Sequence, residues 1–167
     1  PRTDDPHLLK LHGERFPIVL HGQLPGTDIP SVDVDNAHGA KVAVDHLLSL
    51  THRAIGIITN APLVYTASQQ RLRGYKEALA QAGVQYDERM VREGNFDGES
   101  GKSAMEALLT CDPMPTAVFV ASDMVAMGAL KTISEHGLRV PDDIALVGFD
   151  DITAARFVTP TLTTVRL

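Results

Sequence analysis

Short, almost wholly apolar runs alternate along this chain with longer stretches in which apolar residues recur at helical spacing. The runs at residues 54–59, 117–121 and 144–149 are typical of strands that are buried on both faces of a sheet. The stretches that end at Gly83 and Gly137 predict helices, because glycine is the usual residue just after a helix C-terminus. The pattern therefore predicts an alternation of buried strands and amphipathic helices.

From Arg53 onward the predicted order is β-α-β-α-β-α-β. Helices of about a dozen residues between short strands favour parallel neighbours and a right-handed, doubly wound sheet. We expect helices at residues 5–15, 36–50, 68–82, 99–109 and 123–136. We expect strands at residues 18–20, 31–35, 54–59, 90–93, 117–121 and 144–149, and an extended segment at residues 158–167.

The elements expected before Arg53 are too few to complete a sheet of their own. We therefore predict an α/β protein with two lobes built on doubly wound parallel sheets, of which the N-terminal lobe is only partly present. The predicted division places a partial N-terminal lobe and a crossover helix at residues 1–51 and the C-terminal lobe at residues 52–157. Residues 158–167 are expected to return toward the N-terminal lobe.

Arg71 is the first candidate for a binding residue. On the helix expected at residues 68–82 it points with the apolar stripe, whereas Arg73 points to the opposite side. It also falls in the first turn of that helix, where the helix dipole opposes a positive charge. A guanidinium in this position needs either a nearby carboxylate, as an ion pair of the fold, or a ligand that presents paired oxygens.

Polar residues follow two of the buried strands, and ligands bind at the carboxyl edge of an open parallel sheet. Ser122 and Asp123 follow one strand, and Asp150 and Asp151 follow the other. Asp150 can accept hydrogen bonds from vicinal hydroxyls, and together with Arg71 it suits a sugar-like polyol better than a purine. The alternative is structural, since an acid at a strand end often caps a helix or a turn. For Asp123 we favour the cap.

Two further candidates lie outside the buried strands. Phe96 is an aromatic residue among Gly, Asn and Asp in the loop EGNFDGES, so it either covers the loop or stacks on the apolar face of a sugar ring. Asp35, at the end of SVDVD, either caps the helix that follows or contacts the ligand.

Composition and motifs limit the remaining functions. The 167 residues are 44% hydrophobic, enough for one sizeable core, and the net charge of −6 without a run of Lys or Arg argues against nucleic-acid binding by this part. The single Cys111 rules out an internal disulfide and fits a reducing compartment. Metal-ligand spacing, a phosphate loop and a nucleophile–base pair are all missing. We expect a binding protein without a cofactor or metal, rather than an enzyme.

Several phrases together resemble one family. They are SVDVDNAHGAKVAVDHLLSLTHRAIGII, SQQRLRGYKEAL, EGNFDGESG, TAVFVASDMVAMGAL, GLRVPDDIALVGFDD and TPTLTTVR. These phrases are similar to the effector-binding domain of LacI/GalR-type bacterial transcription regulators over almost the whole chain, and the combination of VPDDIALVGFDD with TPTLTTVR is specific. The chain begins at Pro1 rather than with Met, and we expect it to be part of a longer protein.

The resemblance implies a periplasmic-binding-protein-like fold with a small effector, often a sugar or a nucleobase, in the cleft between the lobes. It also implies a homodimer, a cytoplasmic location, no membrane contact, and operator DNA bound only through a headpiece outside this chain.

The resemblance also assigns roles to the candidate residues. Arg71 matches the family's ligand-clamping arginine, Asp150 matches the acid of its GFDD or GYDD motif, Phe96 falls where an aromatic residue often covers the ligand, and Asp35 falls at the crossover acid. Ser122 stands where the family usually has Asn, which removes a two-sided amide. The family's later glutamine contact would align near Leu167, so that contact is absent or misplaced.

We therefore expect the sensing domain of a sugar-responsive repressor. A periplasmic sugar-binding protein of a transport system is the alternative, because it would share the fold and the clamp. An α/β enzyme that uses Asp150 and Asp151 is disfavoured, since adjacent residues on an extended segment point to opposite faces.

Overall fold

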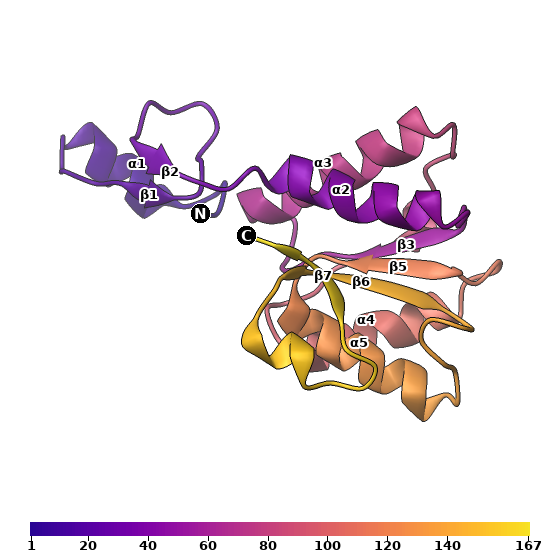
Figure 1. Cartoon of the computed structure of the whole chain (residues 1–167). Helices are drawn as coiled ribbons and strands as arrows, with labels where there is room; N and C mark the ends of the chain where they lie inside the picture. Colours follow the sequence, from indigo (N-terminus) through magenta and orange to yellow (C-terminus); the bar gives the residue numbers. More distant parts are fainter.

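A five-stranded parallel sheet is the centre of the computed structural model, which describes all 167 residues (Figure 1). The strand order is β4-β3-β5-β6-β7, and every neighbouring pair is parallel. This arrangement confirms the predicted doubly wound α/β sheet. The strands are β3 (Ile55–Ile58), β4 (Val91–Arg92), β5 (Ala117–Val120), β6 (Ala145–Asp150) and β7 (Thr163–Arg166).

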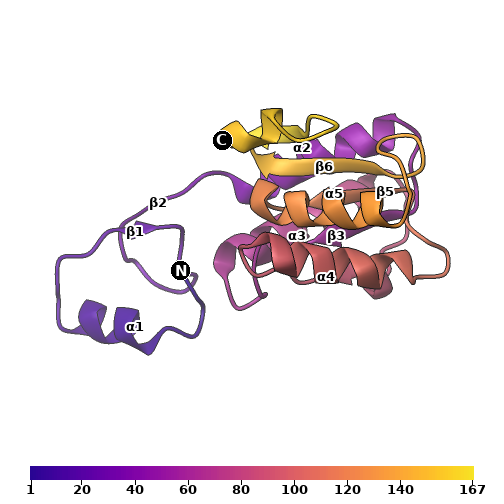
Figure 2. The same cartoon turned by 90° about the horizontal axis from the view of Figure 1, so that it is seen from below.

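Helices cover both faces of this sheet, two on each side (Figures 1 and 2). Successive side chains of a strand point to opposite faces, so Phe119 packs under the first helix pair and Val118 under the second. Both faces are therefore dry, which explains why the strands are uniformly apolar rather than alternating. The first pair is α2 (Asn36–Ser49) and α3 (Thr66–Gln81), and the second is α4 (Gly98–Leu109) and α5 (Asp123–Glu135).

The N-terminal part of the chain lies to one side of this sandwich (Figures 1 and 2). It contains α1 (Pro6–Gly13) and a two-stranded parallel sheet of β1 (Leu20–His21) and β2 (Ser31–Val32). Among its hydrophobic residues only Leu24 and Ile29 are buried. This part therefore has little core of its own, as expected for a lobe that is only partly present.

Two elements at the boundaries of the predicted division pack with the C-terminal sheet. Helix α2, the predicted crossover helix within residues 1–51, buries its apolar side, with Val44 and Leu47, in the core against the C-terminal sheet. Within the segment predicted to return toward the N-terminal lobe, residues 158–167, β7 is a full strand of the same sheet, paired with β6, and it ends at the edge that faces the N-terminal part (Figure 1). A helical period shows that a face is buried, but not against which sheet it packs.

Boundaries shift in two places that matter for the site. Helix α3 begins at Thr66 rather than Ser68, so Arg71 lies beyond the first turn and the expected conflict with the helix dipole is weaker than predicted. A short 3-10 helix at Thr153–Arg156, which the sequence pattern did not indicate, follows β6. No helix combines the length and the apolar character that crossing a bilayer requires.

Candidate functional site

The carboxyl ends of β3, β5 and β6 meet at the edge of the sheet that faces the N-terminal part of the chain (Figure 1). Asn60 follows β3, Ser122 follows β5, and Asp150 is the last residue of β6. Arg71 reaches the same edge from α3, where it is 7% exposed. The parallel topology therefore gathers polar groups from segments that are far apart in the sequence.

The guanidinium of Arg71 is held from several sides. Its Nε donates to Oδ1 of Asn36 at 2.8 Å, and its Nη1 donates to the carbonyl oxygen of Ala121 at 2.5 Å. Its central carbon lies 3.9 Å from the ring centroid of Phe149, and Nη1 lies 3.7 Å from Oδ1 of Asp150. The remaining nitrogen, Nη2, has no protein partner and is not sealed off from solvent. One arm of the guanidinium fork is therefore free for a ligand.

Asp150 presents its carboxylate between two partners. Oδ2 accepts a hydrogen bond from Oγ of Ser122 at 3.2 Å, and Oδ1 faces Arg71. The φ angle of Asp150 is 118°, in a region that L side chains rarely adopt. Such strained backbone angles are concentrated at binding and catalytic sites. The carboxylate of Asp150 is therefore directed by an unusual backbone conformation at the strand end.

Burial shifts the pKa values of both charged groups toward their neutral forms. The pKa of Arg71 is lowered by burial, and the negative charges of Asp150 and Asp33 oppose that shift. The pKa of Asp150 is raised by burial, while Arg71 and the hydrogen bond from Ser122 pull it down. Each group thus relies on the other to remain charged, and a ligand that supplies further hydrogen bonds would stabilise both charges.

A hollow of about 190 Å³ opens beside this cluster, between the N-terminal part and the sheet edge. Arg71 forms part of its wall, whereas Asp150 and Ser122 do not. The residues lining the hollow come from both parts of the chain: Pro1, His21, Gly22, Asp33, Val34, Asn36, Asn60, Tyr65, Thr66, Ala67, Arg71, Phe96 and Leu167.

Phe96, for which the sequence left open either a cover for its loop or a ligand contact, lies on the wall of the hollow. Its side chain is 50% exposed and packs edge-on against Tyr65, with ring centroids 5.0 Å apart. A φ of 65° turns the loop at this residue, and its amide donates to the carbonyl oxygen of Asn60. The two rings give the hollow an apolar side opposite its polar groups.

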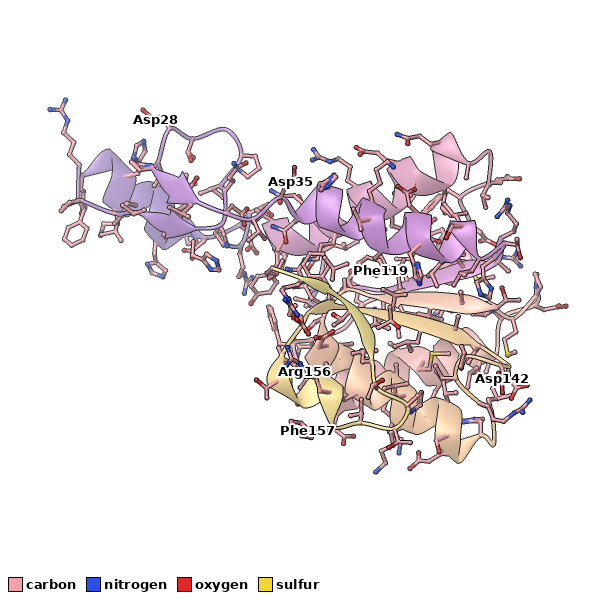
Figure 3. The ribbon with its side chains drawn as sticks, viewed as in Figure 1. Asp28, Asp35, Phe119, Asp142, Arg156 and Phe157 are labelled. Atoms are coloured by element: carbon pink, nitrogen blue, oxygen red, sulfur yellow. The ribbon has the colours of Figure 1, made fainter.

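Asp35 and Asp123 have structural roles in this arrangement. Asp35 lies at the junction of the two parts (Figure 3), and its carboxylate caps α2 by accepting from the amide of His38 at 2.9 Å. Asp123 is fully buried and accepts from Oγ1 of Thr164 at 2.7 Å and from the amide of Ile152 at 3.0 Å. It therefore ties β7 and the segment after β6 to the start of α5, and it is neither the helix cap that we favoured nor a wall of the hollow.

Asp151 is separated from Asp150 by backbone geometry rather than by the alternation of an extended strand. Both residues have positive φ angles, 54° for Asp151 and 118° for Asp150, so the segment is not extended as the sequence argument assumed. The carboxylate of Asp151 pairs with Nε of Arg166 at 2.5 Å and lies 3.8 Å from Arg156. Asp150 thus contacts Arg71 and Ser122, whereas Asp151 contacts Arg166 and Arg156, so the two carboxylates do not form an acid–base pair.

The sequence analysis did not single out several residues of the site, among them Asn36, Asn60 and Tyr65. Asn60 follows the apolar strand β3, a signal that was available but was not used. Asn36 could be interpreted only as a helix start, and Tyr65 only as a loop residue. No group of three or more His, Cys, Asp or Glu side chains is placed to hold a metal ion. The arrangement supplies hydrogen-bond donors, acceptors and an apolar wall, which are the features of a binding site.

Comparison with known proteins shows the family to which this chain is similar. Residues 44–167 match the family of periplasmic binding protein-like domains. The HTH-type transcriptional regulator CelR of Thermobifida fusca is 40% identical over 166 residues, which are 98% of this chain and 48% of that protein. The HTH-type transcriptional repressor CytR of Escherichia coli is 38% identical over 150 residues, 89% of this chain and 44% of that protein. The chain thus spans about half the length of the curated relatives that it matches.

Solved structures show the same similarity. A complex of the transcriptional regulator CelR with cellobiose superposes with a TM-score of 0.93 at 39% identity, covering 100% of this chain and 52% of that one. A LacI family transcriptional regulator from Mycobacterium smegmatis superposes with a TM-score of 0.90 at 35% identity, covering 100% of this chain and 62% of that one.

Proposed function

Because this chain belongs to the family of periplasmic binding protein-like domains, and its relatives are LacI-type transcription regulators, we propose that it is the effector-sensing part of such a regulator. The effector is a small hydroxyl-rich molecule, a sugar or a sugar derivative, that binds between the N-terminal part and the sheet edge. Arg71 is the central donor, and Phe96 is the apolar contact.

One observation carries this proposal. The side chain of Arg71, whose Nη2 makes no hydrogen bond within the protein, forms part of the wall of a hollow that also contains polar groups and the ring of Phe96. A sugar ring has hydroxyls at its rim and apolar C–H faces, so it can bond to the first and stack on the second. Asp150 lies 3.7 Å from Nη1 of Arg71 and becomes a ligand contact if the guanidinium moves away from it. The solved complex of CelR with cellobiose supports a saccharide.

The regulatory step follows from the position of the site between two parts of the molecule. A ligand shifts a conformational equilibrium only if it prefers one arrangement of those parts over the other. Operator DNA is bound by a headpiece outside this chain, the regulator is a homodimer, and it acts in the cytoplasm where its DNA is. A periplasmic transport protein is not favoured, since the relatives are transcription regulators.

Isothermal titration calorimetry of the purified chain tests the proposal, with cellobiose first and then a panel of mono- and disaccharides, sugar phosphates and nucleobases. We expect saturable binding of a saccharide that is lost in Arg71→Ala. A thermal-shift assay run beside it should show about 2.7 kcal/mol of added stability at a hundred times the dissociation constant. Binding of a nucleobase with no response to any saccharide would replace the sugar assignment, and turnover of a saccharide would contradict the absence of enzymatic activity.

A further inference from the structure

Asn36 is the most buried polar residue at the junction between the two parts of the chain. Its side chain is 1% exposed, although it begins α2 directly beside the segment that leads in from the N-terminal part. Nearly complete burial of an amide requires hydrogen bonds for its nitrogen and its oxygen. Asn36 makes those bonds in two opposite directions.

The orientation of this amide is fixed by the chemistry of its neighbours. Arginine carries only donors, so the group facing Nε of Arg71 at 2.8 Å must be the oxygen Oδ1. The nitrogen Nδ2 then donates to Oδ1 of Asp33 at 3.1 Å, and it also lies 3.3 Å from the carbonyl oxygen of Val34. An ionised carboxylate only accepts, so the two ends of the amide cannot be exchanged.

Asp33 continues the chain of hydrogen bonds into the N-terminal part. Its Oδ1 also accepts from the amide of Val34 at 2.8 Å, and its Oδ2 lies 3.3 Å from the amide of Gln23, in the loop between β1 and β2. Arg71, at the other end, contacts the carbonyl oxygen of Ala121 after β5. The relay from Gln23 to Ala121 therefore spans the junction, with Asn36 at its centre.

We propose that Asn36 is a positioning residue that couples the ligand-binding guanidinium of Arg71 to the segment at residues 33–36, and so to the orientation of the N-terminal part. The inference rests on the proposed function, because Arg71 is the donor to the effector. A ligand that draws Nη2 into the hollow rotates the guanidinium and moves Nε. Oδ1 of Asn36 then either follows, carrying Asp33 with it, or loses its partner.

Substitutions can test the contributions of the oxygen and the nitrogen of the Asn36 amide separately. Asn36→Asp keeps an oxygen for Arg71 but replaces the nitrogen with a second oxygen that repels Asp33. The aspartate also suits the first turn of α2, where the helix dipole favours a negative charge, which supports formation of the helix. Asn36→Leu removes both ends. Asp35→Asn is the matched control, because it removes the charge next to Asn36 and keeps a side-chain oxygen that can cap α2, without touching the relay.

The orientation of the N-terminal part can be measured without any ligand. Spin labels at Lys10→Cys on α1 and Lys131→Cys on α5, in a Cys111→Ser background, report the distance between the two parts by pulsed electron paramagnetic resonance. We expect a broader distance distribution in Asn36→Asp and Asn36→Leu than in the otherwise unsubstituted double-labelled chain and in Asp35→Asn. An Asn36→Asp distribution as narrow as that of Asp35→Asn overturns the inference, whether or not a ligand is known.

The binding readout separates the inference from the proposed function. The Nε–H signal of Arg71 in NMR should stay protected from exchange in Asn36→Asp and become exchangeable in Asn36→Leu. With cellobiose as the probe, Asn36→Leu should bind about 10- to 100-fold more weakly, as expected for a lost hydrogen bond to a charged group. Asn36→Asp, which keeps an oxygen acceptor for Arg71, should lose less affinity than Asn36→Leu but should lose the ligand-induced change in label distance. If cellobiose fails to bind the unsubstituted chain, the choice of saccharide fails while the ligand-free distance and exchange results still decide the role of Asn36.

Discussion

Nη1 of Arg71 lies 3.7 Å from Oδ1 of Asp150, so a guanidinium from a helix and a carboxylate from a strand end share one edge of the sheet. Both side chains are largely buried, and burial disfavours the charged form of each. Each charge therefore stabilises the charged form of its partner, and the surrounding hydrogen bonds hold the pair in place. A polar ligand can add further hydrogen bonds to these two charges. The predictions that follow test the pair, its surroundings and the packing that supports it.

Arg71→Ala should abolish saccharide binding and lower the free energy of unfolding by about 1–3 kcal/mol, because Asn36 and Ala121 lose their donor. Calorimetry and urea unfolding measure the two effects. The control is Arg73→Ala, whose side chain is 64% exposed beside Glu77 and should change the free energy of unfolding by no more than about 0.5 kcal/mol. Unchanged affinity in Arg71→Ala would reject the assignment of this residue.

Asp150 should make stability depend on pH in a direction opposite to that of an ordinary paired acid. Its pKa in the folded chain is raised above the ordinary value of 3.8 by burial. Such a group contributes stability below its unfolded pKa and loses that contribution as the pH rises through the folded pKa. The stability of the unsubstituted chain relative to Asp150→Asn should therefore fall as the pH rises from about 4.

Asp143 provides a control for the direction in which Asp150 changes stability with pH. Arg139 lowers the pKa of Asp143, so the contribution of Asp143 should be present above its unfolded pKa and should disappear as the pH falls. Urea unfolding at a series of pH values compares Asp143→Asn with Asp150→Asn. In addition, Arg71→Met should raise the pKa of Asp150 further in an NMR titration, because an opposing positive charge is removed. A downward shift in that variant would contradict the described pairing.

Phe96→Ala should weaken saccharide binding by about 3- to 10-fold and leave stability nearly unchanged, because the ring is half exposed and serves mainly as a wall of the hollow. Phe157 is 80% exposed and belongs to a different face, near the 3-10 helix after β6 (Figure 3). Phe157→Ala is therefore the control, with no expected effect on affinity in calorimetry. Equal affinities for both variants would remove Phe96 from the site.

Asp123→Ala should destabilise the chain, since the partly buried amide of Ile152 and hydroxyl of Thr164 lose their acceptor. An unmade buried hydrogen bond costs about 1–3 kcal/mol. Asp35→Ala should lower the free energy of unfolding by about 1 kcal/mol through the lost helix cap. Thermal unfolding ranks the two, and saccharide affinity that survives in Asp35→Ala would agree with its role as a cap.

Gly74→Ala tests the close packing of α2 on α3. A Cβ at this position would overlap the carbonyl oxygen of Ala37, so the two helices would have to separate. Overpacking of this kind typically destabilises by about 1–3 kcal/mol. Gly13→Ala is the matched control, because nothing lies within 4 Å of its added Cβ and alanine favours the helix. Chemical unfolding should show a loss for Gly74→Ala and no loss for Gly13→Ala.

The order of helices and strands could be predicted from the sequence because it depends on local periodicity. Residues 54–59 and 117–121 are apolar on both sides, and that pattern is enough to indicate strands buried on both faces. The parallel topology then placed Asp150 at the carboxyl edge, and the stripe on α3 turned Arg71 inward. These predictions required only the spacing of residues along one segment.

The assignment of α2 and β7 to the C-terminal sheet, the structural role of Asp123 and the relay through Asn36 were decided only by the tertiary structure. Periodicity tells which side of a helix is buried, but not which of two sheets buries it. Asp35, Asn36 and Asp123 are all plausible helix-start residues in a sequence. Only their hydrogen-bond partners show that Asp35 caps α2, that Asp123 binds β7 and the segment after β6, and that Asn36 lies in the relay. Packing over the whole sheet brings those partners close to Asp35, Asn36 and Asp123. A local pattern of hydrophobic and polar residues does not specify which residues from distant segments become neighbours.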